Sequence, residues 1–557
     1  MNNDLGFKRK KSSIITLDAE NIISSVPLLR GMAISETAIV LGDDGLSEMI
    51  SKGVRVCPNE WEDGRFFAVV EDGEKIRILT DPMGQDTIYV YSSEGMTIDG
   101  AYVDGWIASN SFLQLAQTVK ERDLPITFSP SVISASLSTE GRGFGAQLLS
   151  NRTPIKQVFV LPIGCEIEVC KFSRKAKILR KRKADFFIES IEGSFEDLLE
   201  VFVIKTCARL KALIDSNIFD INFDLSGGHD SRALVGFALK IGADLNAIPV
   251  YSNKKWMFDL ASAKQVSQEF GFPLRTTRDP ILVAPGAYDL WKLSSLGVYL
   301  PVYAHGAPTT ENNSLIVHGG NFLSKEFGEK SAFHIASKLA SRMSSLEEGE
   351  KIKQIFFSAF DSIGIDPGYK WASHLHYLNF RARFHYGRNW VGNTRRSVIT
   401  PLISPFFARA AFKLQPQEYN NLRPSMELLM SLDNRLVELP FDSVEKNFSK
   451  EQMELSPFYK KSIPVNVSVL PTLTIYGKGL VAPKISSNND MASLDCLRKD
   501  FKRYSKSSVQ SGAIKPETLI RAQEVLEGTS SLPNGGRLAA LVVSAGTFWE
   551  LSDTCDQ

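Results

Sequence analysis

Short apolar runs separated by turn-forming residues dominate the first 170 or so residues of the chain. Gly, Asp and Pro cluster between these runs, for example at 81–84, as they do in the turns between strands. A later pair of runs predicts a hairpin that bends at Pro162 and Gly164. The predicted strands are Phe66–Val70, Lys75–Leu79, Thr87–Tyr91, Val158–Pro162 and Glu166–Cys170.

The pattern changes to helical spacing and then to alternating strands and helices. Glu196–Ile214 carries apolar residues at helical spacing, with Ser194 as a candidate N-cap. The alternation that follows predicts a parallel sheet with crossover helices. Beyond about residue 330 we expect helices to the end of the chain, interrupted by loops. The alternating elements are the strand Ile221–Leu225, the helix Ser231–Lys240, the strand Ala247–Tyr251 and the helix Asp259–Phe270.

Length and charge limit the possible classes of protein. The 557 residues predict at least two domains, which we place at 1–185 and 186–557. With 43% apolar and 23% charged residues and a net charge of +1, the chain has the balance of a soluble protein and no bulk attraction for nucleic acid. The basic run Lys171–Lys183 is interpreted as an exposed edge strand and linker rather than a nucleic-acid patch.

Cysteines and apolar segments indicate a cytoplasmic protein. The six cysteines lie far apart without a C-x-x-C pair, so we interpret them as reduced thiols. No apolar core of a signal peptide follows Met1–Lys11, and the longest apolar run, Leu538–Val543, is too short to span a membrane. We therefore expect no membrane association.

The segment 221–232, I-N-F-D-L-S-G-G-H-D-S-R, carries the candidate chemistry. A strand, a glycine turn and a helix N-terminus follow one another there, and this arrangement suits a polyphosphate. Ser226 and Ser231 can add hydroxyl donors, and Asp230 can hold Mg²⁺. The Walker A spacing and lysine are absent. The alternative is a tight turn between strand and helix that binds no ligand.

S-G-G-x-D-S resembles the signature of the PP-loop ATP pyrophosphatases. In that family the loop grips the β- and γ-phosphates of ATP while a substrate attacks the α-phosphate, which releases pyrophosphate and leaves an adenylate. The resemblance assigns ATP and Mg²⁺ as cofactors, with Asp230 as catalytic metal ligand. It assigns nucleotide binding to Leu225, Ser226, Gly227, Gly228, Asp230, Ser231, Val250, His318 and Gly319.

Further motifs resemble the asparagine synthetase-like superfamily. Residues 64–68 (G-R-F-F-A) and 81–91 (D-P-M-G-Q-D-T-I-Y-V-Y) are similar to two motifs of its glutaminase domain, and 107–110 and 161–164 are similar to two more. Thr400–Ser404 is similar to a later motif of the synthetase domain. The resemblance implies an α/β fold: an N-terminal αββα sandwich of the N-terminal-nucleophile (Ntn) type, then a Rossmann-like PP-loop synthetase domain with a helical extension.

Two departures from the family pattern change the expected activity. Asn2 follows Met1 and no cysteine precedes Cys57, so we expect no glutamine hydrolysis, as in β-lactam synthetase and lasso-peptide cyclases. The family's second metal loop is altered in 317–328, where no Asp falls in register. Asn321 or Glu326 could replace it, and the sequence does not decide between them.

Basic residues in the C-terminal half are further candidates. Lys446 or Lys450 corresponds to the family's lysine that stabilises the adenylating transition state, and we assign the catalytic role to Lys446. A zinc pair of His374 and His376 is disfavoured, because residues two apart face different sides of a helix. The arginines at 381, 383 and 388 could bind pyrophosphate or a substrate carboxylate, or form a solvated basic face.

These features predict an AMP-forming ligase that adenylates a carboxylate and couples it to an amine. The partners are then a carboxylate substrate, small or peptidic, and an amine, with room for a protein that delivers the substrate. Peptide macrocyclisation, metabolite amidation and saccharide amidation all remain open. The alternatives are a non-catalytic nucleotide-binding homologue or partner-binding scaffold, and a PP-loop enzyme acting on RNA, against which the near-zero net charge argues.

Overall fold

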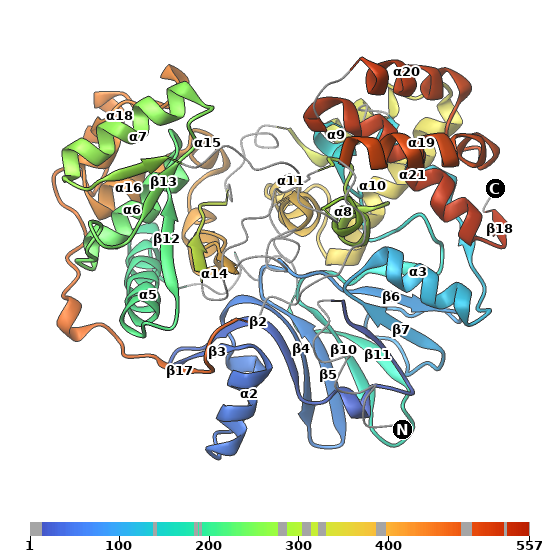
Figure 1. The fold of residues 1–557 in the computed structure, drawn as a ribbon, viewed down its shortest axis with the longest axis horizontal. Coiled ribbons are helices and arrows are strands. Elements are labelled where there is room, and N and C mark those ends of the chain that lie inside the picture. Colours follow the sequence, from blue (N-terminus) through green and yellow to red (C-terminus); the bar gives the residue numbers. More distant parts are fainter. Residues whose placement is uncertain are drawn as a thin grey trace.

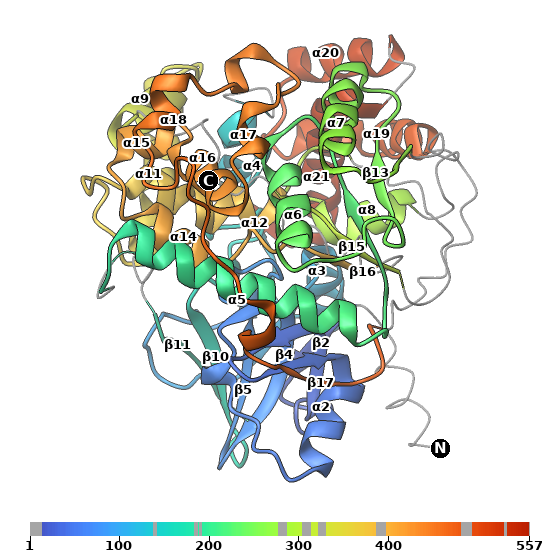
Figure 2. The same cartoon turned by 90° about the vertical axis from the view of Figure 1, so that its left-hand side faces the viewer.

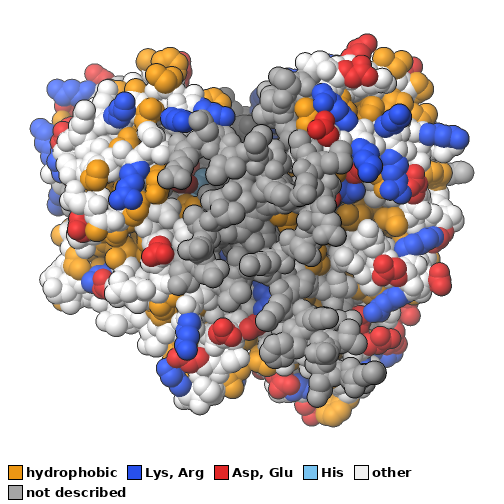
Figure 3. Space-filling model, in the orientation of Figure 1, with side chains coloured by type: hydrophobic (Ala, Val, Ile, Leu, Met, Phe, Trp, Pro, Cys, Tyr) orange, Lys and Arg blue, Asp and Glu red, His pale blue; other side chains and the backbone are white. Residues whose placement is uncertain are grey.

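The protein is a mixed α/β structure with several sheets, seen in a computed structural model (Figure 1). The strands of the described residues form sheets of seven, five, four and two strands. On the face shown in Figure 3, Lys and Arg side chains are interspersed with Asp and Glu. The structure describes residues 14–137, 142–182, 188, 192–276, 287–302, 314–320, 330–385, 397–480, 493–528 and 532–555.

The N-terminal part contains the seven-stranded and the four-stranded sheet. Their orders are β11-β10-β5-β4-β2-β3-β17 and β1-β7-β6-β9. The strands are β1 (Thr16–Asp18), β2 (Leu28–Ile34), β3 (Ala38–Leu41), β4 (Asp63–Asp72), β5 (Lys75–Thr80), β6 (Tyr89–Ser92), β7 (Trp106–Ser109), β9 (Val158–Val160), β10 (Cys165–Cys170), β11 (Ala176–Arg180) and β17 (Thr474–Tyr476).

The two sheets pack face to face, and a helix covers each outer face. Phe67 and Val69 of β4 share a buried cluster with Val90 of β6. On the outside of the large sheet, Leu46 of α2 (Gly42–Ser51) joins a second cluster, and α3 (Phe112–Glu121) packs on β6 and β7. Period-2 alternation in the strands sends one set of side chains to each face, which produces this layering.

A five-stranded parallel sheet follows in the order β14-β13-β12-β15-β16. The chain runs outward from β12 through β13 to β14, then returns to place β15 and β16 on the other side of β12. The order therefore reverses at β12, and the carboxyl ends of three adjacent strands meet beside it. The strands are β12 (Asp220–Asp224), β13 (Val250–Ser252), β14 (Leu274–Thr276), β15 (Ser314–Val317) and β16 (Ser397–Ile399).

The long helix α5 (Phe195–Asp215) connects the two parts of the fold. It lies across the seven-stranded sheet (Figure 2) and packs on α6 (His229–Lys240) and α14 (Pro405–Ala411). Ser194 caps it with a reciprocal hydrogen-bond pair with Asp197. Arg209 of α5 forms an ion pair of 2.6 Å with Asp63 of β4. Helix α6 connects β12 to β13, and α7 (Met257–Phe270) connects β13 to β14.

Helices make up most of the remaining chain, and α19, α20 and α21 pack on one another. None of the helices in the described ranges combines the length and apolarity that crossing a membrane requires. Apart from short 3-10 helices, the remaining described elements are α4 (Pro130–Leu137), α8 (Ala287–Ser295), α9 (Ala332–Ala340), α10 (Leu346–Ile363), α11 (Ala372–His376), the π-helix η6 (Tyr377–Ala382), α12 (Arg383–His385), α15 (Pro416–Asn420), α16 (Arg423–Leu432), α17 (Arg435–Glu438), α18 (Lys450–Glu454), α19 (Ser493–Gln510), α20 (Pro516–Glu527), α21 (Leu532–Leu551), and the paired strands β8 (Thr127–Phe128) and β18 (Thr554–Cys555).

Two predictions from the sequence are wrong. The predicted hairpin does not form, because β9 pairs with β6 in the small sheet while β10 pairs with β5 and β11 in the large one. The chain crosses between the sheets at the Pro162–Gly164 bend instead of folding back. The chain beyond 330 is also not purely helical: β16 completes the parallel sheet, and β17 pairs with β3 of the N-terminal sheet. The boundary at 185 stays a prediction.

Candidate functional site

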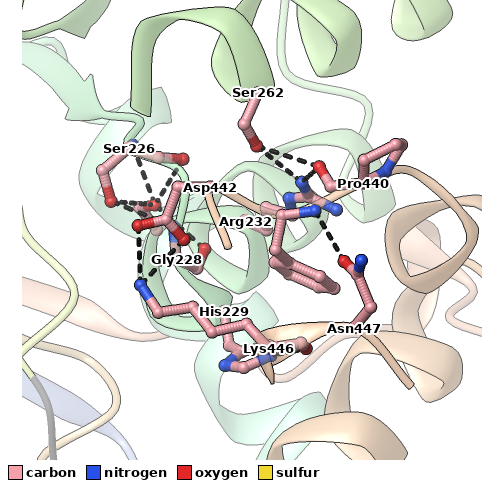
Figure 4. Close-up of polar contacts among 11 residues, drawn as sticks. Ser226, Gly228, His229, Arg232, Ser262, Pro440, Asp442, Lys446 and Asn447 are labelled. Carbon is pink, nitrogen blue, oxygen red and sulfur yellow. Dashed lines mark hydrogen bonds and ion pairs between the residues drawn. The ribbon is translucent and has the colours of Figure 1, made fainter. Parts of the chain in front are cut away.

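The loop Ser226–Gly228 joins β12 to α6 at the point where the strand order reverses. Leu225 is buried, and its amide donates to the carbonyl of Tyr251 over 2.8 Å, which fixes the start of the loop on β13. The hydroxyls of Ser226 and Ser231 lie 3.0 Å apart, and the Ser231 hydroxyl also accepts from the Ser226 amide (Figure 4). The two serines therefore hold the loop against the helix that follows it.

Helix α6 begins at His229 without a side-chain cap on its N-terminus. The amide groups of its first turn have no partner inside the helix, and the helix dipole adds partial positive charge there. Val250 of β13 is fully buried beside this point, paired with Phe223 of β12. The loop and helix together form a concentration of backbone donors that suits phosphate oxygens.

Asp230 lies in the first turn of α6. Among the described residues, no group forms a hydrogen bond or ion pair with its half-buried carboxylate. Burial raises its pKa to about 7, and the positive charge of Lys446 opposes that shift. Gly319 packs against it so closely that a Cβ there would lie 2.7 Å from the Asp230 Cβ. Asp230 is therefore a carboxylate kept available beside the loop Ser226–Gly228, and glycine is required opposite it.

Two further carboxylates lie against the loop glycine Gly227. A Cβ on Gly227 would meet the Asp442 Cβ at 2.2 Å and the Asp259 Oδ1 at 2.9 Å. Burial and Asp442 raise the pKa of Asp259. Burial acts against the shift of Asp442, but hydrogen bonds from Lys446 and Asp259 hold its pKa below the ordinary value. When the pair holds a single proton, that proton is therefore on Asp259 rather than on Asp442.

Lys446 reaches the loop and Lys450 does not. The Lys446 Nζ lies 2.7 Å from both carboxylate oxygens of Asp442. Its backbone carbonyl lies 2.8 Å from Nε2 of His229, the first residue of α6 (Figure 4). Lys450 lies on α18, where its exposed ammonium is 3.6 Å from Glu454. Of the two lysines considered from the sequence, the structure brings Lys446 to the loop Ser226–Gly228.

Arg232 fixes the segment that carries Asp442 and Lys446. Its fully buried guanidinium donates to the Pro440 carbonyl and the Ser262 hydroxyl (Figure 4). The same guanidinium donates to the carbonyls of Leu436 and Leu439. It also stacks on Phe441, with 3.7 Å between the guanidinium carbon and the ring centroid. One side chain on α6 thereby positions a segment more than 200 residues away.

The other candidates from the sequence are His318, a second metal ligand, a pair of histidines and three arginines. His318 follows β15 with an exposed side chain, and its amide donates to Ile399, whereas Asn321, Glu326 and Arg388 lie outside the described residues. His374 contacts Asn420 and His376 contacts the carbonyl of Leu149, and the described residues contain no group of three or more metal-ligating side chains.

Arg381 and Arg383 form no solvated basic face, contrary to one expectation. Arg381 donates to the carbonyl of Gly143, and the buried Arg383 donates to the carbonyls of Gly84 and Leu161. They attach η6 and α12 to the N-terminal part of the chain. The local sequence pattern could not predict these contacts of the two arginines, because their partners lie more than 200 residues away along the chain.

The residues at the loop fit a magnesium-bound nucleotide. Mg²⁺ is commonly held by one or two carboxylates together with phosphate oxygens, and Asp230 is a carboxylate in the first turn of a helix whose N-terminus has no side-chain cap. Sequence reasoning missed Asp442 and Arg232. The spacing of four residues between Asp442 and Lys446 is the one local signal for that pair.

A scan against protein-family models finds none that matches the chain, and a search of curated proteins also gives no match.

Proposed function

We propose that this protein is an ATP- and Mg²⁺-dependent, AMP-forming carbon–nitrogen ligase that adenylates a carboxylate and couples it to an amine. The observation that carries the proposal is the arrangement at the end of β12. An uncapped helix N-terminus, the available carboxylate of Asp230 and the ammonium of Lys446 converge on one loop where the strand order reverses. Ligands of open α/β sheets bind at such points.

Each residue has a distinct task in this proposal. The first-turn amides of α6 and the amides of the serine–glycine loop bind the β- and γ-phosphates. Asp230 would hold Mg²⁺, which neutralises charge on the phosphates when bound. Lys446 places positive charge beside the reacting α-phosphate, where negative charge develops as the substrate carboxylate attacks. Arg232 and Asp442 keep that lysine in position.

The motif resemblance supports the same proposal for the whole chain. We assign 1–185 to a degenerate glutaminase-like domain of the Ntn type and 186–557 to a Rossmann-like PP-loop synthetase domain, in a cytoplasmic protein. The helix–sheet–sheet–helix layering and the parallel strand order are compatible with these assignments. The amine would be supplied by the substrate or by a delivered partner rather than by glutamine hydrolysis.

The test uses hydroxylamine as a general nucleophile. Acyl-adenylates react with it to give hydroxamates, so purified protein is incubated with Mg²⁺-ATP, hydroxylamine and a panel of carboxylic acids and peptides. The expected result is a hydroxamate formed together with equal amounts of AMP and pyrophosphate. Formation of ADP and phosphate would assign a different ligase chemistry. Binding of Mg²⁺-ATP without turnover of any member would favour the non-catalytic homologue.

A further inference from the structure

A cavity of about 60 Å³ lies between the seven-stranded sheet, helix α5 and the residues that follow β16. It is separate from the phosphate loop, and its walls are mainly apolar. The apolar side chains that line it include Met32 and Ile34 of β2, Leu210 and Leu213 of α5, and Ile399 and Ile403 of the β16 region.

Most polar groups in the cavity wall have hydrogen-bond partners in the protein. Asp63 accepts from the Gly64 amide, from Arg209 and from the Ser404 hydroxyl. The Gln85 side chain donates to the Gly64 carbonyl over 3.2 Å and accepts from the Thr400 hydroxyl over 2.7 Å. These groups are therefore fixed and need no ligand.

Arg65 of β4 is the exception within the described wall. Its side chain is 6% exposed, and its only ion pair there is a long one, 3.4 Å from Nη2 to Asp86. Among the residues that the structure describes, no group accepts a hydrogen bond from its buried Nε and Nη1. Leaving such donors unsatisfied costs about 1–3 kcal/mol each. A buried guanidinium with open donors beside an apolar cavity suits an anion that carries an apolar group.

We propose that this cavity binds a short-chain carboxylate, with its carboxylate on Arg65 and its alkyl group against the apolar wall. One water-sized probe occupies roughly 10–15 Å³, so about 60 Å³ holds roughly five non-hydrogen atoms. That size corresponds to an acid of three or four carbons. Charge-assisted hydrogen bonds from arginine to a carboxylate are among the stronger ones available.

Two neighbouring glycines, Gly319 and Gly320, lie between the cavity and the phosphate loop. A Cβ on Gly320 would lie 3.0 Å from Ile403, which lines the cavity, and Gly319 packs against Asp230. An occupant would therefore contact Ile403, the residue that lies against Gly320. The proposal does not depend on the proposed ligase activity, because binding can be measured without ATP.

Calorimetric titration of the full chain with isobutyrate, in the absence of ATP and Mg²⁺, tests the proposal. We expect one site per chain with a millimolar dissociation constant, and binding of the neutral isostere isobutyramide weaker by roughly tenfold or more. Arg65→Lys keeps a positive charge beside Asp86 but lacks the Nε and second Nη donors, so isobutyrate affinity should fall roughly tenfold.

A second pair of variants tests the cavity without changing the charge of Arg65. Leu213→Phe fills the cavity and should abolish binding, whereas Val201→Phe, on the exposed face of the same helix, should leave it unchanged. Circular dichroism checks that each variant is folded. No binding of isobutyrate at tens of millimolar would overturn the proposal and leave ordered water as the partner of Arg65. Equal binding of chloride and isobutyrate would also overturn it, as would full affinity in Leu213→Phe.

Discussion

Asp442 holds the ammonium of Lys446 through both of its carboxylate oxygens, each 2.7 Å from Nζ. The same aspartate touches the loop glycine Gly227, and its amide donates to the Gly227 carbonyl over 3.2 Å. The lysine is therefore fixed relative to the phosphate loop by one neighbour. In the free protein its charge is balanced by Asp442, and phosphate oxygens can compete for it when a nucleotide binds.

Replacing the two candidate lysines separately tests which one is catalytic. Lys446→Met should lower the rate of adenylation roughly a hundredfold or more, because it removes a charge placed at the reacting phosphate. Lys450→Met is the matched control, since its exposed ammonium pairs with Glu454, and its rate should stay within about twofold of wild type. The readout is the initial rate of pyrophosphate release. A larger loss in Lys450→Met would contradict the assignment.

Asp230→Asn tests the proposed metal ligand. It keeps the shape of the side chain but removes the negative charge that would hold Mg²⁺, so the adenylation rate should fall by about a hundredfold or more. The matched control is Asp361→Asn, a change of an exposed carboxylate on α10. Near-normal turnover of Asp230→Asn at saturating Mg²⁺ would remove this residue from the mechanism.

The loop Ser226–Gly228 and its flanking elements were predictable because their signals are local. A short apolar strand, two glycines and a helix with a polar first turn follow one another within 221–232, and β12 and α6 form there. Ser194 likewise signalled the start of α5 through its own side chain and that of Asp197. Such features depend on residues within one or two turns of each other.

Features that depend on distant contacts were not predictable. The runs that form β9 and β10 look like a hairpin in sequence, but β9 pairs with β6 and β10 pairs with β5, so the two strands belong to different sheets. β17 joins β3 across more than 400 residues. The role of Arg232 was hidden for the same reason, because the carbonyls it binds are in a segment with no local relation to α6.

Arg232→Met tests whether this arginine positions the Asp442–Lys446 segment. The substitution leaves the carbonyls of Leu436 and Leu439 without their buried donor, so the free energy of unfolding should fall by about 3 kcal/mol or more. Ser262→Ala removes one of the partners and should cost about 1 kcal/mol. Urea denaturation of the three proteins gives the comparison. Equal stability of Arg232→Met and wild type would show that the segment holds itself in place.

The buried His376 predicts a specific dependence of stability on pH. Burial lowers its pKa to about 4, against the opposing effect of its hydrogen bond to Leu149, from an ordinary value of 6.5. The unfolded chain therefore binds a proton between these values while the folded chain does not. The contribution of His376 to the free energy of unfolding is therefore complete above pH 6.5 and is lost as the pH falls toward 4. The loss over this range amounts to about 3 kcal/mol.

His376→Gln isolates this effect, because glutamine can still donate to the Leu149 carbonyl but does not titrate. The variant should be less stable than wild type at pH 7, since its side chain packs less well than the imidazole among Phe356, Phe360 and Phe380. Between pH 7 and pH 4 it should lose about 3 kcal/mol less than wild type, measured by denaturant unfolding at each pH. His334→Gln, which changes an exposed histidine on α9, should follow the wild-type curve. Parallel curves for wild type and His376→Gln would mean that the imidazole stays uncharged in the unfolded chain or becomes charged in the folded one.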